Sequence, residues 1–304
     1  MLTEKKGKAK RKNGLIIFLF LLPALIIFIV VFAWPFVLTI YSSFTNWDGV
    51  SPMEFIGLKN YQKLFKDRDF NAALWNTCKS ALWAIFVHVP FGVLIALTLS
   101  KKLRGWKLVR STFMLPSMIA TSTYAMLFIY MFRLDSGLVN SIAVSLFGPQ
   151  ANINYINDAN YTFNALTMMW VWYAGVLTLI VLSEIMSISP ELYEAAKVDG
   201  ANEFQIDLYI NLPLLTRIIA TTFIMAITSV FKQFDLIFLS TKGGPSSATL
   251  NLALMSYKKM IFDFKYGWSN AIGVVLMLLG IIVMAGILFL SKKLGSEKPS
   301  KGER

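Results

Sequence analysis

The sequence predicts an all-α integral membrane protein with six transmembrane helices. Hydrophobic residues make up 56% of the 304-residue chain, only 15% of the residues are charged, and the mean hydropathy is +0.59. A soluble domain usually has about 45–50% apolar residues and about 25% charged residues. The apolar residues also gather in long runs, each able to cross about 30 Å of hydrocarbon as a helix. The bilayer is therefore the expected solvent for most of the chain.

The predicted transmembrane helices cover residues 14–40, 76–99, 112–132, 162–187, 214–240 and 268–290. The first run follows a basic stretch, as the apolar part of a signal peptide would. It is too long for that role and no small-residue cleavage site follows, so we expect it to remain as a span. Pro90 and Pro116 lie inside the second and third runs. Because neighbouring helices must satisfy the carbonyls that proline frees, these positions favour a packed bundle over 14–290.

The placement of the basic residues predicts the topology. The net charge is +12, and more than half of the 29 Lys and Arg residues lie in segments on one side of the predicted bundle. Basic residues concentrate on the cytoplasmic side of membrane proteins. We therefore expect a cytoplasmic basic N-terminus at 1–13, a cytoplasmic polar tail at 291–304, and a multi-pass protein of the plasma or inner membrane that contacts lipid. The same placement argues against a nucleic-acid partner.

Cys78 and His88 are the single residues of their types in the chain. An intrachain disulfide is therefore impossible, and two such residues cannot supply the three or four ligands of a zinc site. We expect both side chains to pack between helices. No metal site, no catalytic residue and no cofactor in this chain are expected.

The segment 188–213 between the fourth and fifth runs has its own helical signals. Ser189 is a suitable N-cap, Pro190 suits the first helical turn and Glu191 suits the positive end of the helix dipole. Gly200 permits a left-handed turn before a second apolar stretch that ends at Pro213. We expect a helix–turn–helix that serves as a docking element for a soluble partner, because exposed apolar patches rimmed with charge mark such sites. The alternative is a connector packed on its own bundle.

The same segment resembles the EAA motif of ABC importer permeases, E-A-A-x3-G-x9-I-x-L-P. The matching residues are Glu194, Ala195, Ala196, Asp199, Gly200, Ala201, Ile210, Leu212 and Pro213. Residues 55–61, Asn76-Thr77, Leu115-Pro116 and 239–249 are similar to the sugar-type subgroup, in particular to the first permease subunit of maltose, raffinose or glycerol-3-phosphate importers. The chain departs from the family at Ser189, where proline is usual, and at Glu184, where small or apolar residues are usual.

The resemblance implies the fold of a type I ABC importer permease with a cytoplasmic coupling helix that sits in a groove on an ATP-hydrolysing subunit. It also implies a heterodimer with a second permease subunit, two ATP-binding subunits that hold ATP and Mg, and an extracellular solute-binding protein. Residues Gly243, Gly244 and Pro245 would face that binding protein. The chain has no G-x4-GK[ST] phosphate loop, so ATP hydrolysis is expected in the partners and not in this chain.

The resemblance places the solute pathway on the fifth run and on 169–176 of the fourth. The expected pathway residues are Ala226, Ser229, Val230, Gln233, Trp172, Tyr173, Lys232 and Asp235. Gln233 is the strongest single candidate, because an amide both donates and accepts hydrogen bonds. Aromatic rings suit the apolar faces of sugars, although an interfacial aromatic belt is the alternative for Trp172 and Tyr173. Lys232 and Asp235 have i,i+3 spacing and are expected to pair, which equally suits a purely structural salt bridge.

The sequence therefore indicates alternating-access import of a sugar, with an oligosaccharide expected. No Arg cluster marks a phosphate site, which disfavours glycerol-3-phosphate, although that solute or another small polyol remains the alternative. A secondary transporter that needs no ATPase would show charge relays through several spans and an internal repeat. The sequence shows neither of these features.

Overall fold

A computed structural model describes residues 17–296, and all the regular elements in this range are helices. The predicted basic N-terminus at 1–13 and residues 297–304 of the predicted tail lie outside the described residues. The helix Ile17–Ser43 contains a π-helical turn η1 at Ile29–Ala33 and ends as α2 at Trp34–Ser43. The helices that follow are α3 (Lys59–Lys66), α4 (Arg68–Trp83), η2 (Ala84–His88), α5 (Val89–Ser100), α6 (Trp106–Met118), α7 (Thr121–Met131), α8 (Leu138–Phe147), η3 (Pro149–Ala151), α9 (Ala159–Val171), α10 (Gly175–Ile185), α11 (Pro190–Val198), α12 (Glu203–Ile206), η4 (Asp207–Asn211), α13 (Leu212–Leu214), α14 (Thr216–Lys232), α15 (Asp235–Ser240), α16 (Leu252–Ile261) and α17 (Tyr266–Ser296).

Four helices in the described range are long and apolar enough to cross a membrane. They are Ile17–Ser43, Arg68–Ser100, Ala159–Ile185 and Tyr266–Lys292. Two further spans are obtained if each of two bent helix pairs counts as one. The predicted all-α fold with six spans is therefore confirmed in this form.

The third and fifth predicted spans are not continuous helices, contrary to the expectation from the sequence. The axes of α6 and α7 differ by 104°, and Ile119 and Ala120 between them have extended backbone. Helix α14 ends at Lys232, and Gln233 leaves the helical region with ψ 95° before α15 begins. A further bend of 72° separates Glu203–Leu214 from α14. Hydropathy measures composition along a run and is insensitive to a break of two residues, so these bends were missed.

Three π-helical turns each end two residues before a proline. They are η1 before Pro35, η2 before Pro90 and η4 before Pro213. Proline has no N–H and its ring meets the carbonyl of the preceding turn. One wider turn relieves that clash without ending the helix, because π-bulges insert an extra residue into the hydrogen-bond ladder. The helices therefore continue through Pro35 and Pro90, as the sequence predicted for Pro90.

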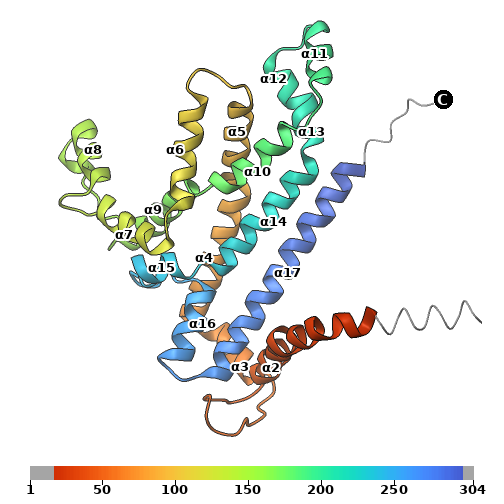
Figure 1. The fold of residues 1–304 in the computed structure, drawn as a ribbon. Helices are drawn as coiled ribbons and strands as arrows, with labels where there is room; N and C mark the ends of the chain where they lie inside the picture. Colours follow the sequence, from red (N-terminus) through yellow and green to blue (C-terminus); the bar gives the residue numbers. More distant parts are fainter. Residues whose placement is uncertain (1–16, 297–304) are drawn as a thin grey trace, which may run out of the picture.

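The core lies where α14 and α17 run side by side with α4 and α16 (Figure 1). Fully buried apolar side chains from distant parts of the chain meet there, among them Phe70, Ile227, Leu252 and Ile272. His88 is buried and its ring stacks on Trp170 with centroids 4.0 Å apart. Cys78 is half-buried. Both residues therefore occupy helix-packing positions.

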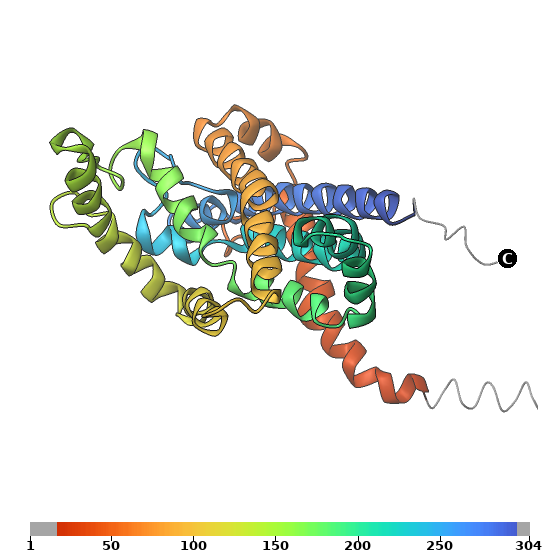
Figure 2. The same cartoon turned by 90° about the horizontal axis from the view of Figure 1, so that it is seen from above.

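The two ends of the bundle carry different structures. Helices α11 and α12 form one end, whereas α3 and the corner between α16 and α17 lie at the opposite end (Figure 1). Seen from above, the helix that leads into α2 leaves the bundle on one side and α8 projects on the other (Figure 2). The apolar residues of Ile17–Ser43 are almost all exposed in the isolated chain. This helix therefore has its apolar surface available for lipid or for another chain.

Candidate coupling segment and solute pocket

Helix α11 begins as the sequence predicted. The Ser189 hydroxyl accepts a hydrogen bond from the backbone N–H of Glu191 at 3.3 Å, and Pro190 occupies the first helical position. Ser189 thus provides the N-cap, with the proline one residue later than the family pattern places it. The helix therefore starts without the proline that the family usually has at position 189.

Gly200 ends α11 with φ +81°. The backbone N–H of Ala201 reaches back to the carbonyl of Ala196 at 2.9 Å, which is the long hydrogen bond of a Schellman motif. A Cβ at Gly200 would meet nothing within 4 Å, so the backbone conformation alone favours glycine here. Helix α12 then begins with a capping box between Asn202 and Gln205. The predicted helix–turn–helix is confirmed.

Helix α11 buries none of its residues in the described chain. Large apolar side chains stand out from this segment, with Val198 87%, Phe204 72% and Tyr209 69% exposed. In the isolated chain the bundle therefore leaves most of α11 uncovered. Exposed apolar side chains outside the spans are typical of surfaces that bind another protein. We call residues 188–213 the coupling segment, after the role that the sequence predicts for them.

The structure brings five of the nine EAA-motif residues to one open groove of about 330 Å³. These residues are Ala196, Asp199, Gly200, Ala201 and Ile210. Glu194 and Ala195 lie on the exposed face of α11, outside this groove, and Pro213 is also exposed. Leu212 is half-buried against the core. Glu184, the departure in the fourth span, is exposed near the end of α10.

A chain of polar contacts joins the coupling segment to the end of α5. The Tyr193 hydroxyl donates to Oδ1 of Asn211 at 2.8 Å, and the Asn211 amide donates to Oδ1 of Asp207 at 2.8 Å. The other oxygen of Asp207 lies 2.8 Å from Nζ of Lys101. Burial, and then the charge of Asp207, raise the pKa of Tyr193, which favours the protonated hydroxyl that donates in this contact. We call these four residues the polar relay.

Gln233 lies at the break between α14 and α15. Its side chain lines a pocket of about 240 Å³ together with Ser229, Lys232, Asp235 and Tyr173. Its backbone carbonyl accepts a hydrogen bond from the Asn251 amide at 2.5 Å, which fixes the break against the start of α16. Interrupted membrane helices leave backbone and side-chain polar groups free to contact a solute. We call this space the Gln233 pocket.

Five of the eight expected pathway residues therefore meet in one place, and three do not. Ala226 and Val230 are buried in the core, each with 2% of its surface exposed. Trp172 lies outside the pocket, where its ring stacks on Phe113 with centroids 5.7 Å apart. On this face of α14, Ser229 and Gln233 line the pocket, whereas Ala226 and Val230 point into the bundle.

The prediction of an ion pair between Lys232 and Asp235 is wrong. The ion pairs of the described chain are Lys101–Asp207, Lys197–Glu203 and Lys259–Asp263. An i,i+3 pair needs a continuous helix, and the backbone leaves the helix at Gln233 between the two residues. Both charged side chains line the Gln233 pocket instead.

The aromatic wall of this pocket was predicted in part: Tyr173 and the stretch 169–176 were expected, whereas Trp170 was not singled out and Tyr124 was not expected. Trp170 and Tyr124 line it together with Tyr173, and the Tyr124 hydroxyl bonds the Met169 carbonyl. Trp170 lines the pocket, whereas the predicted Trp172, two residues later, does not. The difference arises because Trp172 belongs to the turn at 172–174 that separates α9 from α10.

Residues 241–251 form a tightly held loop. The Asn76 amide donates to the carbonyls of Ser247 and Leu250, both at 2.9 Å, and the Thr77 hydroxyl accepts from the Leu252 N–H at 3.1 Å. These contacts give a structural reason for Asn76-Thr77 in the sequence pattern. Gly243 is buried with φ +86°, and a Cβ there would lie 3.0 Å from Leu250. Gly244 and Pro245 are half-buried in the same loop.

Long apolar helices and two bent helix pairs define a multi-pass membrane protein. Residues 88–295 match the family described as binding-protein-dependent transport system inner membrane component. This match covers more than half of the chain. The chain therefore belongs to that family and is a permease of the ABC-transporter type associated with sugar import.

Individual relatives agree with this assignment along almost the whole chain. This chain is 31% identical to the probable ABC transporter permease protein PH1215 of Pyrococcus horikoshii, over 93% of this chain and 97% of the relative. It is 32% identical to the multiple sugar-binding transport system permease protein MsmF of Streptococcus mutans, over 90% of this chain and 94% of the relative. A chain in the crystal structure of a bacterial alginate ABC transporter, in complex with an alginate pentasaccharide-bound periplasmic protein, has the same fold. The TM-score is 0.82 at 21% identity, over 95% of this chain and 98% of that chain.

Proposed function

We propose that this chain forms one half of the translocation pathway of an ATP-driven importer for an oligosaccharide. A second permease subunit supplies the other half, two ATP-binding subunits hydrolyse ATP with Mg, and an extracellular solute-binding protein delivers the sugar. Both termini are then cytoplasmic. The observation that carries the proposal is the coupling segment, which is well formed and yet leaves its apolar side chains uncovered.

The coupling segment fits a docking role because its shape is fixed from within. Ser189 caps α11 and Gly200 ends it, so the helix does not depend on a partner for its boundaries. Val198 and Phe204 remain to be buried, and apolar burial drives most protein association. The polar relay then connects any movement of α11 to α5 through Lys101. A rigid element with a bound partner at one end and a transmembrane helix at the other can transmit ATP-driven motion.

The Gln233 pocket fits a neutral, hydroxyl-rich solute. Gln233 supplies both donors and acceptors, and Trp170 and Tyr173 supply aromatic surface. Lys232 and Asp235 contribute opposite charges to the same lining, so the pocket has no excess of positive charge for a phosphate. The 240 Å³ volume suits one or two sugar rings, and a longer chain would pass through it sequentially. This balance favours a saccharide over glycerol-3-phosphate, which remains the second candidate.

Co-purification with candidate ATP-binding subunits tests the proposal. The wild-type chain is compared with Glu194→Lys and Gly200→Val, and Lys107→Gln on the exposed first turn of α6 is the matched control. We expect the two motif variants to lose the ATP-binding subunits and sugar-coupled ATP hydrolysis, while the control retains both. Retention of the subunits and of coupled transport in both motif variants would refute the docking role.

A further inference from the structure

A second, larger cavity lies at the opposite end of the bundle from the coupling segment. It has a volume of about 630 Å³ and is bounded by the 44–56 loop, α3 and the corner between α16 and α17. Helix α2 ends at Ser43 and α17 begins at Tyr266, so two membrane-spanning helices meet the cavity at their ends. The ends of membrane-spanning helices lie near the boundary between hydrocarbon and water, where lipid head groups are found. None of the eight expected pathway residues lines this cavity.

The walls of the cavity are fixed by contacts between distant parts of the chain. The Asn60 amide donates to the carbonyls of Ser43 and Thr45 at 2.8 and 2.9 Å. The N–H of Gly267 donates to the carbonyl of Trp47 at 2.9 Å, and the Trp47 ring lies 5.3 Å from that of Tyr266. The cavity is therefore formed before any ligand arrives, which lowers the entropy cost of binding.

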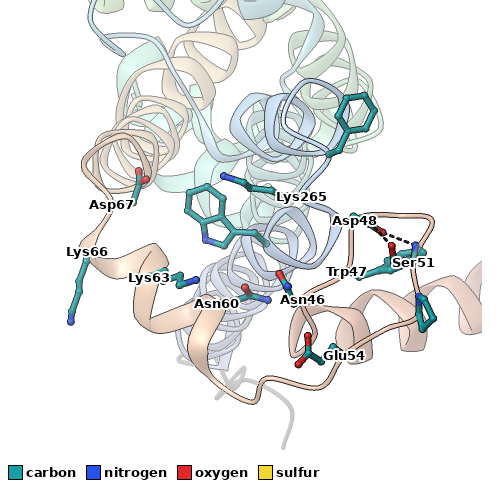
Figure 3. A pocket seen from close by; sticks show the side chains of 13 residues that line it. Asn46, Trp47, Asp48, Ser51, Glu54, Asn60, Lys63, Lys66, Asp67 and Lys265 are labelled. Carbon is teal, nitrogen blue, oxygen red and sulfur yellow. Dashed lines mark hydrogen bonds between the residues drawn. The ribbon is translucent and has the colours of Figure 1, made fainter.

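Charged side chains of both signs line this cavity without neutralising each other. Lys63 and Lys265 approach it from different elements, whereas Lys66 extends away from the other labelled side chains (Figure 3). Neither Lys63 nor Lys265 is in an ion pair within the described residues, and the same holds for Glu54. Lys265 lies 5.8 Å from the ring of Trp268, which also lines the cavity.

The two aspartates of the lining are already engaged. Asp48 accepts hydrogen bonds from the N–H groups of Val50 and Ser51 and from the Ser51 hydroxyl, and these bonds lower its pKa to about 2. Asp67 caps α4 through the N–H of Phe70 at 2.8 Å. The lining therefore presents the ammonium groups of Lys63, Lys66 and Lys265, and within the described residues Glu54 is its carboxylate without such an internal hydrogen bond.

We propose that this cavity binds the zwitterionic head group of a phosphatidylethanolamine lipid. The lipid phosphate matches Lys63 and Lys265, because ammonium groups bind phosphate oxygens with charge-assisted hydrogen bonds. The primary ammonium of ethanolamine matches Glu54, to which it can donate hydrogen bonds that a choline group cannot. Trp268 is placed as interfacial tryptophans are, beside the glycerol region of a lipid. The apolar surface of the preceding helix Ile17–Ser43 is available to the acyl chains.

Native mass spectrometry of the full-length chain tests this proposal. The protein is reconstituted in vesicles with equal amounts of phosphatidylethanolamine, phosphatidylcholine and phosphatidylglycerol and released in mild detergent, and the retained lipids are counted. We expect phosphatidylethanolamine to be enriched over both other lipids. Lys63→Gln combined with Lys265→Gln should reduce this enrichment about tenfold, the effect of losing one to two charge-assisted hydrogen bonds. Lys59→Gln, on the same helix α3 but outside the lining of the cavity, is the matched control and should retain lipid as the wild type does.

Glu54→Gln separates a zwitterion site from an anion site, and it supplies a second test if the double variant does not fold. It should lower phosphatidylethanolamine retention while leaving phosphatidylglycerol retention unchanged. Soluble glycerophosphoethanolamine should displace the lipid only weakly, because it has no acyl chains. Four results would overturn the proposal: equal retention of the three lipids, preferential retention of phosphatidylglycerol, equally strong binding of the soluble head group, or displacement by oligosaccharides. None of these measurements depends on transport, so their outcome does not decide whether the proposed import function is correct.

Discussion

Nζ of Lys101, at the end of α5, lies 2.8 Å from a carboxylate oxygen of Asp207 in the coupling segment. The two residues are more than one hundred positions apart in the chain. Their side chains are 27% and 15% exposed, so the pair is partly shielded from water. It is the end of the polar relay that starts at Tyr193 on α11. Movement of the coupling segment is therefore predicted to reach α5 through this pair, in addition to α10 and α14, to which the segment is joined along the chain.

Replacing Lys101 should uncouple ATP hydrolysis from transport. Lys101→Met leaves the partly buried Asp207 without its cation, which costs on the order of 1–3 kcal/mol locally. We expect sugar uptake to fall about tenfold while the ATP-binding subunits still bind. Uptake and ATP hydrolysis in proteoliposomes measure the two effects. The charge-exchanged pair, Lys101→Asp with Asp207→Lys, should recover part of the coupling. Failure of both variants to alter the ratio of uptake to hydrolysis would exclude this contact from the coupling pathway.

Gly200 should be replaceable by asparagine but not by valine. The residue has φ +81° and open space around its missing Cβ, so only the backbone conformation is restricted. The left-handed conformation costs an ordinary residue about 1–2 kcal/mol, whereas asparagine adopts it more readily and β-branched residues resist it. We expect Gly200→Asn to retain the ATP-binding subunits and Gly200→Val to lose most of them. Equal loss in both variants would instead indicate that a side chain at this position obstructs the partner.

Gln233→Ala should weaken sugar recognition with little effect on assembly. The side chain lines the pocket at the α14–α15 break, and the loss of one or two hydrogen bonds raises KM for uptake about tenfold. Trp172→Leu is the comparison, because Trp172 lies outside this pocket against Phe113. The KM of that variant should remain within about twofold of the wild type. A larger effect at Trp172 than at Gln233 would place the solute site elsewhere.

Asn76→Ala should loosen the 241–251 loop. It removes the donors to the carbonyls of Ser247 and Leu250, and each unsatisfied buried carbonyl costs about 1–3 kcal/mol. Hydrogen exchange of the backbone amides in 241–251 should accelerate, while exchange in α11 stays unchanged. Asn71→Ala, on the exposed face of the same helix, serves as control. If exchange in this loop is the same in the Asn76 variant and the wild type, Asn76 does not hold the loop.

The sequence predicted local features well because their signals are local. Ser189, Pro190 and Gly200 each mark a helix boundary through chemistry that acts within a few residues, and the structure places the boundaries there. The number of spans was also predictable from hydropathy. The EAA motif indicated the family to which the chain belongs, whereas composition alone indicated only a membrane protein.

Other features depend on contacts that no local pattern encodes. The break at Gln233 involves only two residues inside an apolar run, and hydropathy does not detect it. The predictions of a continuous helix and of an ion pair between Lys232 and Asp235 are therefore wrong. Trp170 could not be distinguished from Trp172 without the turn that separates α9 from α10. The Lys101–Asp207 pair joins positions whose proximity follows from the packing of the whole bundle.

Photo-crosslinking at Val198 tests the central claim most directly, because this exposed side chain lies on the coupling segment and forms no part of the bundle core. The residue is replaced by p-benzoylphenylalanine in the full chain, expressed together with its candidate ATP-binding subunits, and the membranes are irradiated. The docking role of the coupling segment predicts a covalent product with an ATP-binding subunit, lost when Gly200→Val is added. A product with lipid or with the permease chains alone, from complexes that still contain the ATP-binding subunits, would contradict it.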